Sequence, residues 1–291
     1  MPWYFFAIMA ALLGGLATIT QKNVLRKEHA MSYAATLGLA NLLLCLPLIF
    51  FVDWRGIDLK VFIYLLLISF VAAAAFLLVA KGVRHMEISA SSPLFIIGPA
   101  ITALLAYLIL GESFSRWQTL GLGFLILGLY ILESHKSAGW LEPFKIIRGN
   151  KYIHYIFLAL VLYGITGIVD RVVLGYYQLD TLTYIFLIHL FLGINLLAMI
   201  FIWHDGFNDL KIGFKQAGWW IVLVSFLTIS YRWFQAEAIS MAYVGLVIAI
   251  KRTESLFSTL VGGEIWQEKN LFHKLMAAGV MILGTVLIVL G

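Results

Sequence analysis

The feature that most constrains this chain is a succession of apolar stretches, each about as long as a bilayer is thick. A transmembrane helix needs about 20 predominantly apolar residues, and charged residues make up only 12% of this chain, against about 25% in soluble domains. The stretches cover residues 3–21, 31–52, 60–80, 88–110, 115–132, 153–174, 181–203, 217–238, 240–262 and 271–290. The sequence therefore predicts an all-α polytopic membrane protein with ten transmembrane helices in the lipid bilayer.

The connections between these stretches leave no room for a separate soluble domain. The longest connection covers only residues 133–152, and the signatures HExxH, GxSxG and a Walker-type loop are absent. The single cysteine, Cys45, excludes a disulfide within the chain and a cysteine-based metal site. The net charge of +5 is ordinary for a membrane protein. We therefore expect no enzyme activity, no metal, no cofactor and no nucleic-acid partner.

Lysine and arginine residues are unevenly divided among the connections. The odd-numbered connections hold thirteen of them and the even-numbered connections four. Because positive charge is retained on the cytoplasmic side, we expect the odd connections in the cytoplasm and both termini outside. The expected location is the plasma (inner) membrane of a bacterium or archaeon, with the protein as a monomer or homodimer.

The second half of the chain repeats the first. At an offset of 156 residues, Glu112 falls on Glu268, and GFLILG at 123–128 falls on GVMILG at 279–284. Nearer the start, GLATITQKNVL matches GITGIVDRVVL at an offset of 149. Five helices per copy is an odd number, so the second copy enters the membrane from the opposite side. The predicted organisation is two inverted five-helix repeats, residues 1–137 and 152–291, joined by residues 138–151. Inverted repeats are typical of transporters that open a midplane site to alternate sides.

This pattern resembles the drug/metabolite transporter (DMT) superfamily in its EamA-type ten-helix form. The residues that carry the resemblance are LGESFSRWQTLGLGFLILG at 110–128 and LVGGEIWQEKNLFHKLMAAGVMILG at 260–284, together with Pro93 and Pro99. The resemblance implies a secondary transporter of a small metabolite. The chain departs from the pattern in its second half, where Ala249 and Ser255 stand in place of the two prolines.

Three charged residues interrupt the apolar stretch over 240–262. The run AIKRTESLF at 249–257 contains Lys251, Arg252 and Glu254. A lysine or arginine facing lipid at the helix centre costs about 2.5–3.5 kcal/mol, so these side chains face a wet cavity or each other. Their counterparts at the offset of 156 are Phe95, Ile96 and Gly98. The repeat thus builds the same helix without charges, which favours a functional role; the alternative is a scaffold ion pair between Lys251 and Glu254.

Helical spacing places further polar residues on shared faces. The substrate-binding candidates are Lys251, Arg252, Glu254, Ser255, Arg232, Gln235, Tyr231, Thr228, Tyr163 and Thr18. The proton-coupling candidates are Glu254, His189 and Asp170. Two of these have structural alternatives, because His189 can be hydrogen-bonded within the bundle and Asp170 can form an interfacial pair with Arg171. Glu112 and Glu268 are expected to cap the helices that follow them, in a structural or gating role.

The interior charges indicate the ligand. Arg232, Lys251 and Arg252 face one clear anion, Glu254, so the substrate is expected to be anionic (phosphorylated or carboxylate) or zwitterionic. The Lys-Arg pair is also similar to the pair with which the phosphate translocators of this superfamily hold a phosphate. No ATP site is present, so a coupling proton or an exchanged substrate is the expected driving partner. The alternatives are an exporter of amino acids or hydrophobic drugs with an aromatic-lined cavity, and a lipid-headgroup flippase or accessory membrane protein.

Overall fold

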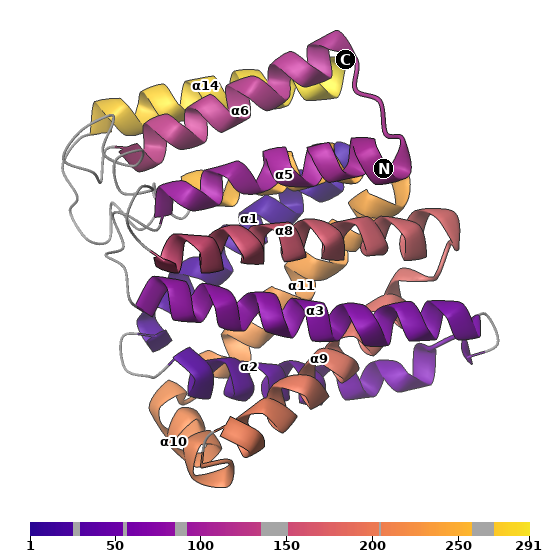
Figure 1. Ribbon diagram of the computed structural model, residues 1–291, viewed down its shortest axis with the longest axis vertical. Coiled ribbons are helices and arrows are strands. Elements are labelled where there is room, and N and C mark those ends of the chain that lie inside the picture. Colours follow the sequence, from indigo (N-terminus) through magenta and orange to yellow (C-terminus); the bar gives the residue numbers. More distant parts are fainter. Residues whose placement is uncertain (26–29, 55–56, 85–91, 135–150, 204, 258–270) are drawn as a thin grey trace.

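Apolar helices form nearly all of the described chain and run back and forth across the molecule (Figure 1). The computed structural model describes residues 1–25, 30–54, 57–84, 92–134, 151–203, 205–257 and 271–291. The elements are α1 (Trp3–Leu25), α2 (Ala30–Cys45), η1 (Leu46–Phe51), α3 (Leu59–Arg84), η3 (Ser92–Ile97), α5 (Gly98–Leu105), η4 (Ala106–Leu110), α6 (Arg116–Ser134), α8 (Lys151–Arg171), η5 (Val172–Tyr176), α9 (Thr181–Trp203), α10 (Phe207–Ala217), α11 (Trp220–Met241), α12 (Val244–Lys251) and α14 (Leu271–Leu290).

Several of these helices are long and apolar enough to cross a membrane. Within the described ranges, five meet this test: Trp3–Gln21, Met31–Phe51, Leu59–Val79, Tyr152–Tyr176 and Thr181–Trp203. The bent pair α10 and α11, which meet at 93°, makes a sixth if it is one span. Shorter apolar helices cover Leu94–Leu110, Arg116–Leu132 and Leu275–Leu290. The structure therefore confirms an all-helical polytopic membrane protein, while the count of ten helices and the inversion of the halves stay predictions.

Helix α10 is an element that the apolar pattern did not predict, because its residues are too polar for a span. Its buried residues are Leu210, Gly213 and Ala217. They recur at helical spacing, and the helix packs against α2. Gly206 and Gly218 flank it with φ angles of 53° and 56°, a backbone conformation that glycine adopts without steric strain. The chain can thus turn sharply into α10 and out of it, and α11 begins at Trp220, later than the predicted residue 217.

The charged segment is also less regular than the predicted helix over 240–262. Helix α12 ends at Lys251, and the next backbone bonds span three residues, from Thr253 to Ile250 (3.0 Å) and from Leu256 to Thr253 (2.9 Å). In such a tightened turn, residues three apart lie one above the other. Residues 258–270, with Glu268, lie outside the described part of the chain, so the predicted cap by Glu268 stays a prediction.

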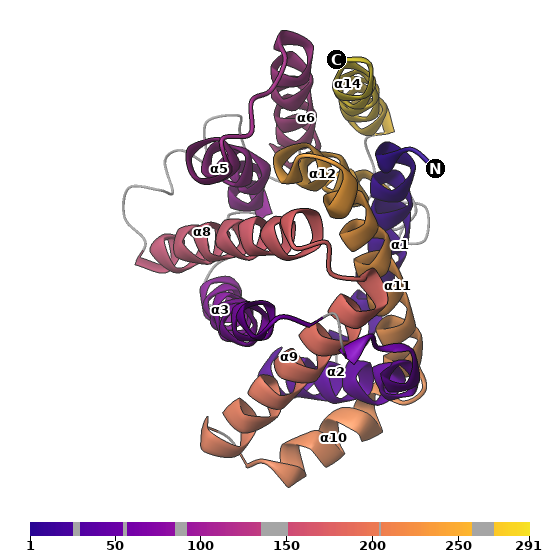
Figure 2. The ribbon, with the colours of Figure 1, turned by 90° about the vertical axis from the view of Figure 1, so that its right-hand side faces the viewer.

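Each helix packs mainly against helices of the other predicted half. Five of these pairs are α1 with α11, α3 with α8, α2 with α9, α5 with α12, and α6 with α14. If each helix is replaced by its predicted counterpart in the other half, the first pair becomes the second and the second becomes the first. The other three pairs stay the same. Figures 1 and 2 both show α6 and α14 side by side. A Cβ atom on Gly121 would lie 2.6 Å from the Gly284 carbonyl oxygen, so glycine is what permits this approach of two backbones.

Two hydrogen bonds between polar side chains are related to each other by the same exchange of counterpart residues. Asn195 Nδ2 on α9 donates to Ser69 Oγ on α3 over 2.7 Å, and Ser225 Oγ on α11 donates to Asn41 Oδ1 on α2 over 2.5 Å. Asn195 is the repeat counterpart of Asn41 at an offset of 154, and Ser225 is the counterpart of Ser69 at 156. Each bond therefore joins one half to the other at an equivalent place.

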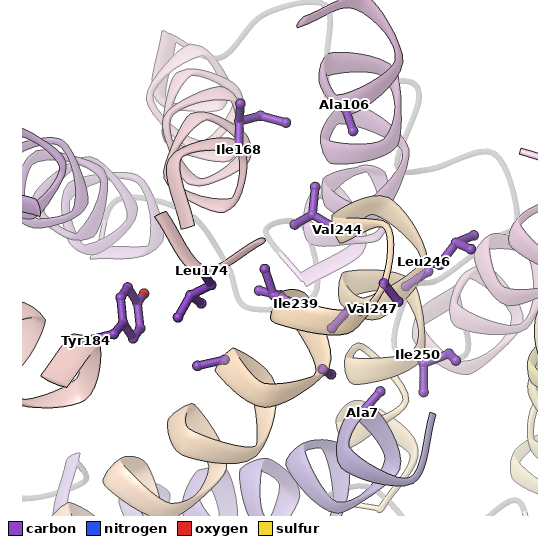
Figure 3. Packing of buried hydrophobic residues seen from close by; sticks show 14 of the residues in the cluster. Ala7, Ala106, Ile168, Leu174, Tyr184, Ile239, Val244, Leu246, Val247 and Ile250 are labelled. Atoms are coloured by element: carbon purple, nitrogen blue, oxygen red, sulfur yellow. The ribbon is translucent and has the colours of Figure 1, made fainter. Parts of the chain in front are cut away.

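The largest buried apolar cluster of the described residues extends through most of the bundle, and one part of it lies where η4, α8, η5, α11 and α12 meet. Figure 3 shows Ala106, Ile168, Leu174, Ile239 and Val244 gathered in this region. All five side chains are at most 5% exposed. The bundle is therefore tightly packed at this end.

Candidate functional site

A cavity of about 400 Å³ lies between eight helices of the described structure. Four come from the first half (α1, α2, α3 and α5) and four from the second (α8, α9, α11 and α12). Its charged and hydrogen-bonding lining residues include Thr18, Gln21, Asn41, Thr102, Tyr163, Asp170, His189, Thr228, Tyr231, Arg232, Gln235, Lys251, Arg252 and Glu254. The volume falls within the range of about 300–1,000 Å³ that is usual for small-molecule sites.

The cavity reaches from the middle of the bundle toward one end. Its lining includes Gln21 near the end of α1, Phe76 in the last third of α3 and Leu196 in the second half of α9. Asp170, Gln235 and Ile248 line its opposite limit, each within four residues of a buried apolar residue of the largest cluster (Ile168, Ile239 and Val244). The cavity thus extends toward the odd-numbered connections, on the predicted cytoplasmic side.

The tightened turn after α12 brings Lys251 and Glu254 together. Lys251 Nζ lies 2.8 Å from Glu254 Oε2 and donates to Glu254 Oε1 over 2.9 Å. The same ammonium group lies 4.8 Å from the centre of the Tyr231 ring on α11, within cation–π distance. The predicted ion pair is therefore present, and it lies on the cavity wall. The functional role of these charges stays a prediction.

Two glycines lie beside the charged side chains, and one of them, Gly14, makes room for a carboxylate. The Glu254 carboxylate lies against Gly14 of α1, so close that a Cβ atom there would overlap it. A Cβ atom on Gly98 of α5 would lie 3.5 Å from Arg252 Nη2, which is ordinary contact. Arg252 Nη1 is 4.0 Å from Glu254, and the arginine side chain is 29% exposed. Arg252 is therefore the less tightly paired cation of this segment.

Arg232 forms a second, deeper group with residues of α8 and α9. Asp170 is 4% exposed, accepts a hydrogen bond from the Tyr184 hydroxyl and interacts electrostatically with Arg232. Tyr163 lies near the same guanidinium. Asp170 consequently belongs to the cavity wall, whereas its neighbour Arg171 points toward Glu112 and the end of α11. The predicted interfacial pair of Asp170 with Arg171 is not what these contacts form.

His189 also lies on the cavity wall, 3% exposed. Its Nδ1 atom is 2.8 Å from the carbonyl oxygen of Ile185 one turn earlier. A carbonyl can only accept, so Nδ1 carries a proton and Nε2 is the remaining acceptor. The histidine is thus hydrogen-bonded within the bundle and adjacent to the cavity, and its role in proton coupling stays a prediction.

All but one of the predicted site residues line the cavity. The exception is Ser255, whose hydroxyl donates to the Arg252 carbonyl over 3.1 Å. The regular helix assumed in the prediction placed Ser255 on the face of Lys251, and the tightened turn moves it away. The prediction missed Gln21, Tyr33, Asn41 and Thr102. A signal existed for Asn41, because an asparagine recurs at its repeat position within another apolar stretch.

The lining carries three cations and two carboxylates. The cations are Arg232, Lys251 and Arg252, and the carboxylates are Asp170 and Glu254. One positive charge is therefore in excess when the carboxylates are ionised. The sequence overestimated this excess, because it counted Glu254 as the one clear anion.

Comparisons with known proteins agree with this class of fold, a polytopic helical membrane protein. The model of the EamA-like transporter family matches residues 1–134 and 150–290. The chain belongs to this family and is a membrane transporter of the DMT superfamily.

The comparison with solved structures agrees on the fold. A structure described as "Crystal structure of protein" superimposes with a TM-score of 0.72 over 98% of this chain and 96% of its own. It is one of 28 chains that match. The two sequences are 12% identical, so the likeness shows the fold alone. No curated protein matches the chain.

Proposed function

We propose that the protein is a secondary transporter that binds a small anionic metabolite, phosphorylated or carboxylate, in the central cavity. The observation that carries the proposal is Arg252, a cavity arginine only loosely paired with Glu254, at 4.0 Å. Its guanidinium offers a planar pair of donors that matches phosphate or carboxylate oxygens. Lys251 lies beside it as a point charge that can leave Glu254 for the substrate.

The proposed mechanism is alternating access by two inverted halves. It is supported by the helix pairs that map onto one another when the halves are exchanged. It is supported further by the two equivalent bonds, Asn41 with Ser225 and Asn195 with Ser69. A duplicated scaffold of this kind has two arrangements of similar energy, one open to each side.

Binding to purified protein tests the substrate class. We expect phosphorylated and carboxylate metabolites to raise the thermal midpoint, and organic cations to leave it unchanged. Arg252→Gln should abolish the shift, whereas Lys215→Gln, which removes an exposed cation from α10, should preserve it. Stabilisation of the wild type by cations and not by anions contradicts the proposal.

A zwitterionic substrate, such as an amino acid, is a second candidate because Lys251 and Glu254 lie side by side on the cavity wall. A carboxylate could pair with Lys251 while an ammonium group pairs with Glu254. This candidate predicts that amino acids stabilise the protein more than simple carboxylates do. It also predicts that Glu254→Gln abolishes their effect.

A further inference from the structure

The cavity extends toward the odd-numbered connections, and we call that end the cavity mouth. Glu112 lies at the opposite end of the bundle. It stands on the connection between η4 and α6, directly after Gly111, whose φ of 68° reverses the chain. The side chain is 2% exposed. Its Oε1 atom accepts the backbone amide of Val244 over 3.1 Å and lies 3.7 Å from Arg171 Nε. The expected cap is thus formed on the first turn of α12, in the other half, and not on α6, the helix that follows in the sequence.

Arg171 extends this contact to a third helix. Its Nη1 atom donates to the carbonyl oxygens of Ile239 (2.6 Å) and Ser240 (2.9 Å) in the last turn of α11. The first amides and the last carbonyls of a helix have no partner within that helix. One glutamate and one arginine therefore satisfy the start of α12 and the end of α11 together. We call this pair the Glu112–Arg171 latch.

The latch lies just beyond the inner limit of the cavity, by one residue on α8 and by one helical turn on α11 and α12. On α8, Arg171 directly follows the lining residue Asp170. On α11, Ile239 follows the lining residue Gln235 by four positions, and on α12 Val244 precedes the lining residue Ile248 by four. The latch therefore borders this end of the cavity on α8, α11 and α12.

An apolar layer lies beside the latch. Leu174, Ile239 and Val244 lie close together in Figure 3, and their exposed fractions are 2%, 1% and 0%. They come from η5, which directly follows Arg171, and from α11 and α12, which the latch joins. Opening this end requires the layer and the latch to separate together.

The latch is a buried ion pair in which some polar atoms lack hydrogen bonds. Glu112 Oε2 and Arg171 Nε are buried without a hydrogen-bond partner. Burial raises the pKa of Glu112 above its usual range, although the amides of Val244 and Gly245 and the charge of Arg171 pull the pKa down. Burying charge that is incompletely paired is unfavourable, which suits a contact that must break in each cycle better than a permanent fastening.

We propose that the Glu112–Arg171 latch closes the cavity on the side of residues 106–116, and that it breaks when the cavity opens to that side. The proposal rests on the alternating access of the proposed function. At the sequence level, the repeat counterparts of the pair are Glu268 and Lys22. They are expected to serve the opposite side, in a region whose side chains lie outside the described structure.

Thiol labelling in sealed vesicles tests the latch without any substrate. In a Cys45→Ala background, Val244→Cys reports on the apolar layer and Thr18→Cys reports on the cavity mouth. A membrane-impermeant maleimide is added to one side at a time. Glu112→Ala should speed labelling of Val244→Cys from the latch side about tenfold, as expected for loss of a charge-assisted hydrogen bond, and should slow labelling of Thr18→Cys from the other side. Glu112→Gln keeps an acceptor for Val244 and should have a smaller effect.

Glu237→Gln is the matched control, because it removes a carboxylate from the same end of α11 outside the latch. It should change neither rate. Arg171→Gln serves as a second variant if Glu112→Ala does not fold. Unchanged labelling at both reporters overturns the proposal. Faster labelling at Val244→Cys with no change at Thr18→Cys also overturns it, since this indicates local loosening and not a switch. A reciprocal switch in protein that binds no anion rejects the proposed substrate and leaves the latch standing.

Discussion

Residues 93–101 and 249–257 occupy equivalent places in the two halves but present different chemistry to the interior. Both backbones contain a tightened stretch, because η3 is a 3-10 helix and bonds that span three residues follow the end of α12 at Lys251. The side chains differ, with Phe95, Ile96 and Gly98 opposite Lys251, Arg252 and Glu254. The irregular backbone thus belongs to the duplicated scaffold, and the charges are an addition to one copy.

The sharpest test of this comparison makes the second half like the first. The triple variant Lys251→Phe, Arg252→Ile, Glu254→Gly copies the first-half residues. We expect anion binding to weaken by about 100-fold or more, as for loss of buried charged contacts, while the fold is retained. Isothermal titration measures the binding and circular dichroism the fold. A variant that binds as tightly as the wild type breaks the comparison.

A single substitution separates the roles of the added charges. Glu254→Gln removes the anion that competes with substrate for Lys251, so we expect anion affinity to rise about tenfold, consistent with a charge-assisted hydrogen bond of about 1.5–3 kcal/mol. The measurement is titration with the same ligand as above. A loss of affinity would instead assign Glu254 a direct contact with the substrate, as the zwitterion candidate requires.

The two glycines that face the charges should respond differently. Gly14→Ala displaces the Glu254 carboxylate, so we expect a change in anion affinity of a few-fold, below the effect of removing the charge. Gly98→Ala places a methyl group at ordinary contact distance from Arg252 and should leave affinity unchanged. Equal effects in the two variants would show that the walls around Glu254 and Arg252 are equally tight.

The smallest effect is expected at the two equivalent hydrogen bonds between the halves. Asn41→Ala and Asn195→Ala should each lower stability by about 0.6 kcal/mol, the average for such bonds in membrane proteins. Only Asn41 lines the cavity, so only Asn41→Ala should also alter binding. Urea or detergent unfolding measures the stability. A large difference between the two losses contradicts the equivalence of the halves.

The sequence predicted most of the site because apolar surroundings make polar residues conspicuous. Lys251, Arg232 and Asp170 could be placed on inward faces by helical spacing and by the free energy of exposing charge to lipid. Ser255 was placed on the wrong face because the tightened turn after α12 changes the direction in which the following side chains point. A prediction of local geometry from side-chain pattern alone does not register such a change.

Contacts between distant segments were less accessible to sequence reasoning. Glu112 was expected to cap α6, the next helix in the sequence. It caps α12 instead, because the fold brings the first amide of α12 within hydrogen-bond distance of its carboxylate. Helix α10 was missed for a different reason, since a search for long apolar stretches passes over a short helix with one buried face. The first error concerns a packing partner, which periodicity along one helix does not specify, and the second concerns the length of apolar stretch that the search required.

Helices α6 and α14 contribute none of the described residues that line the cavity, and they pack closely on each other. Their sequences are constrained by mutual fit at positions such as Gly121 and Gly284 and by contact with lipid, not by the ligand. Among relatives that carry different substrates, these two helices should therefore accumulate substitutions as a correlated pair. Substitutions that change substrate specificity should instead occur in the eight helices that line the cavity.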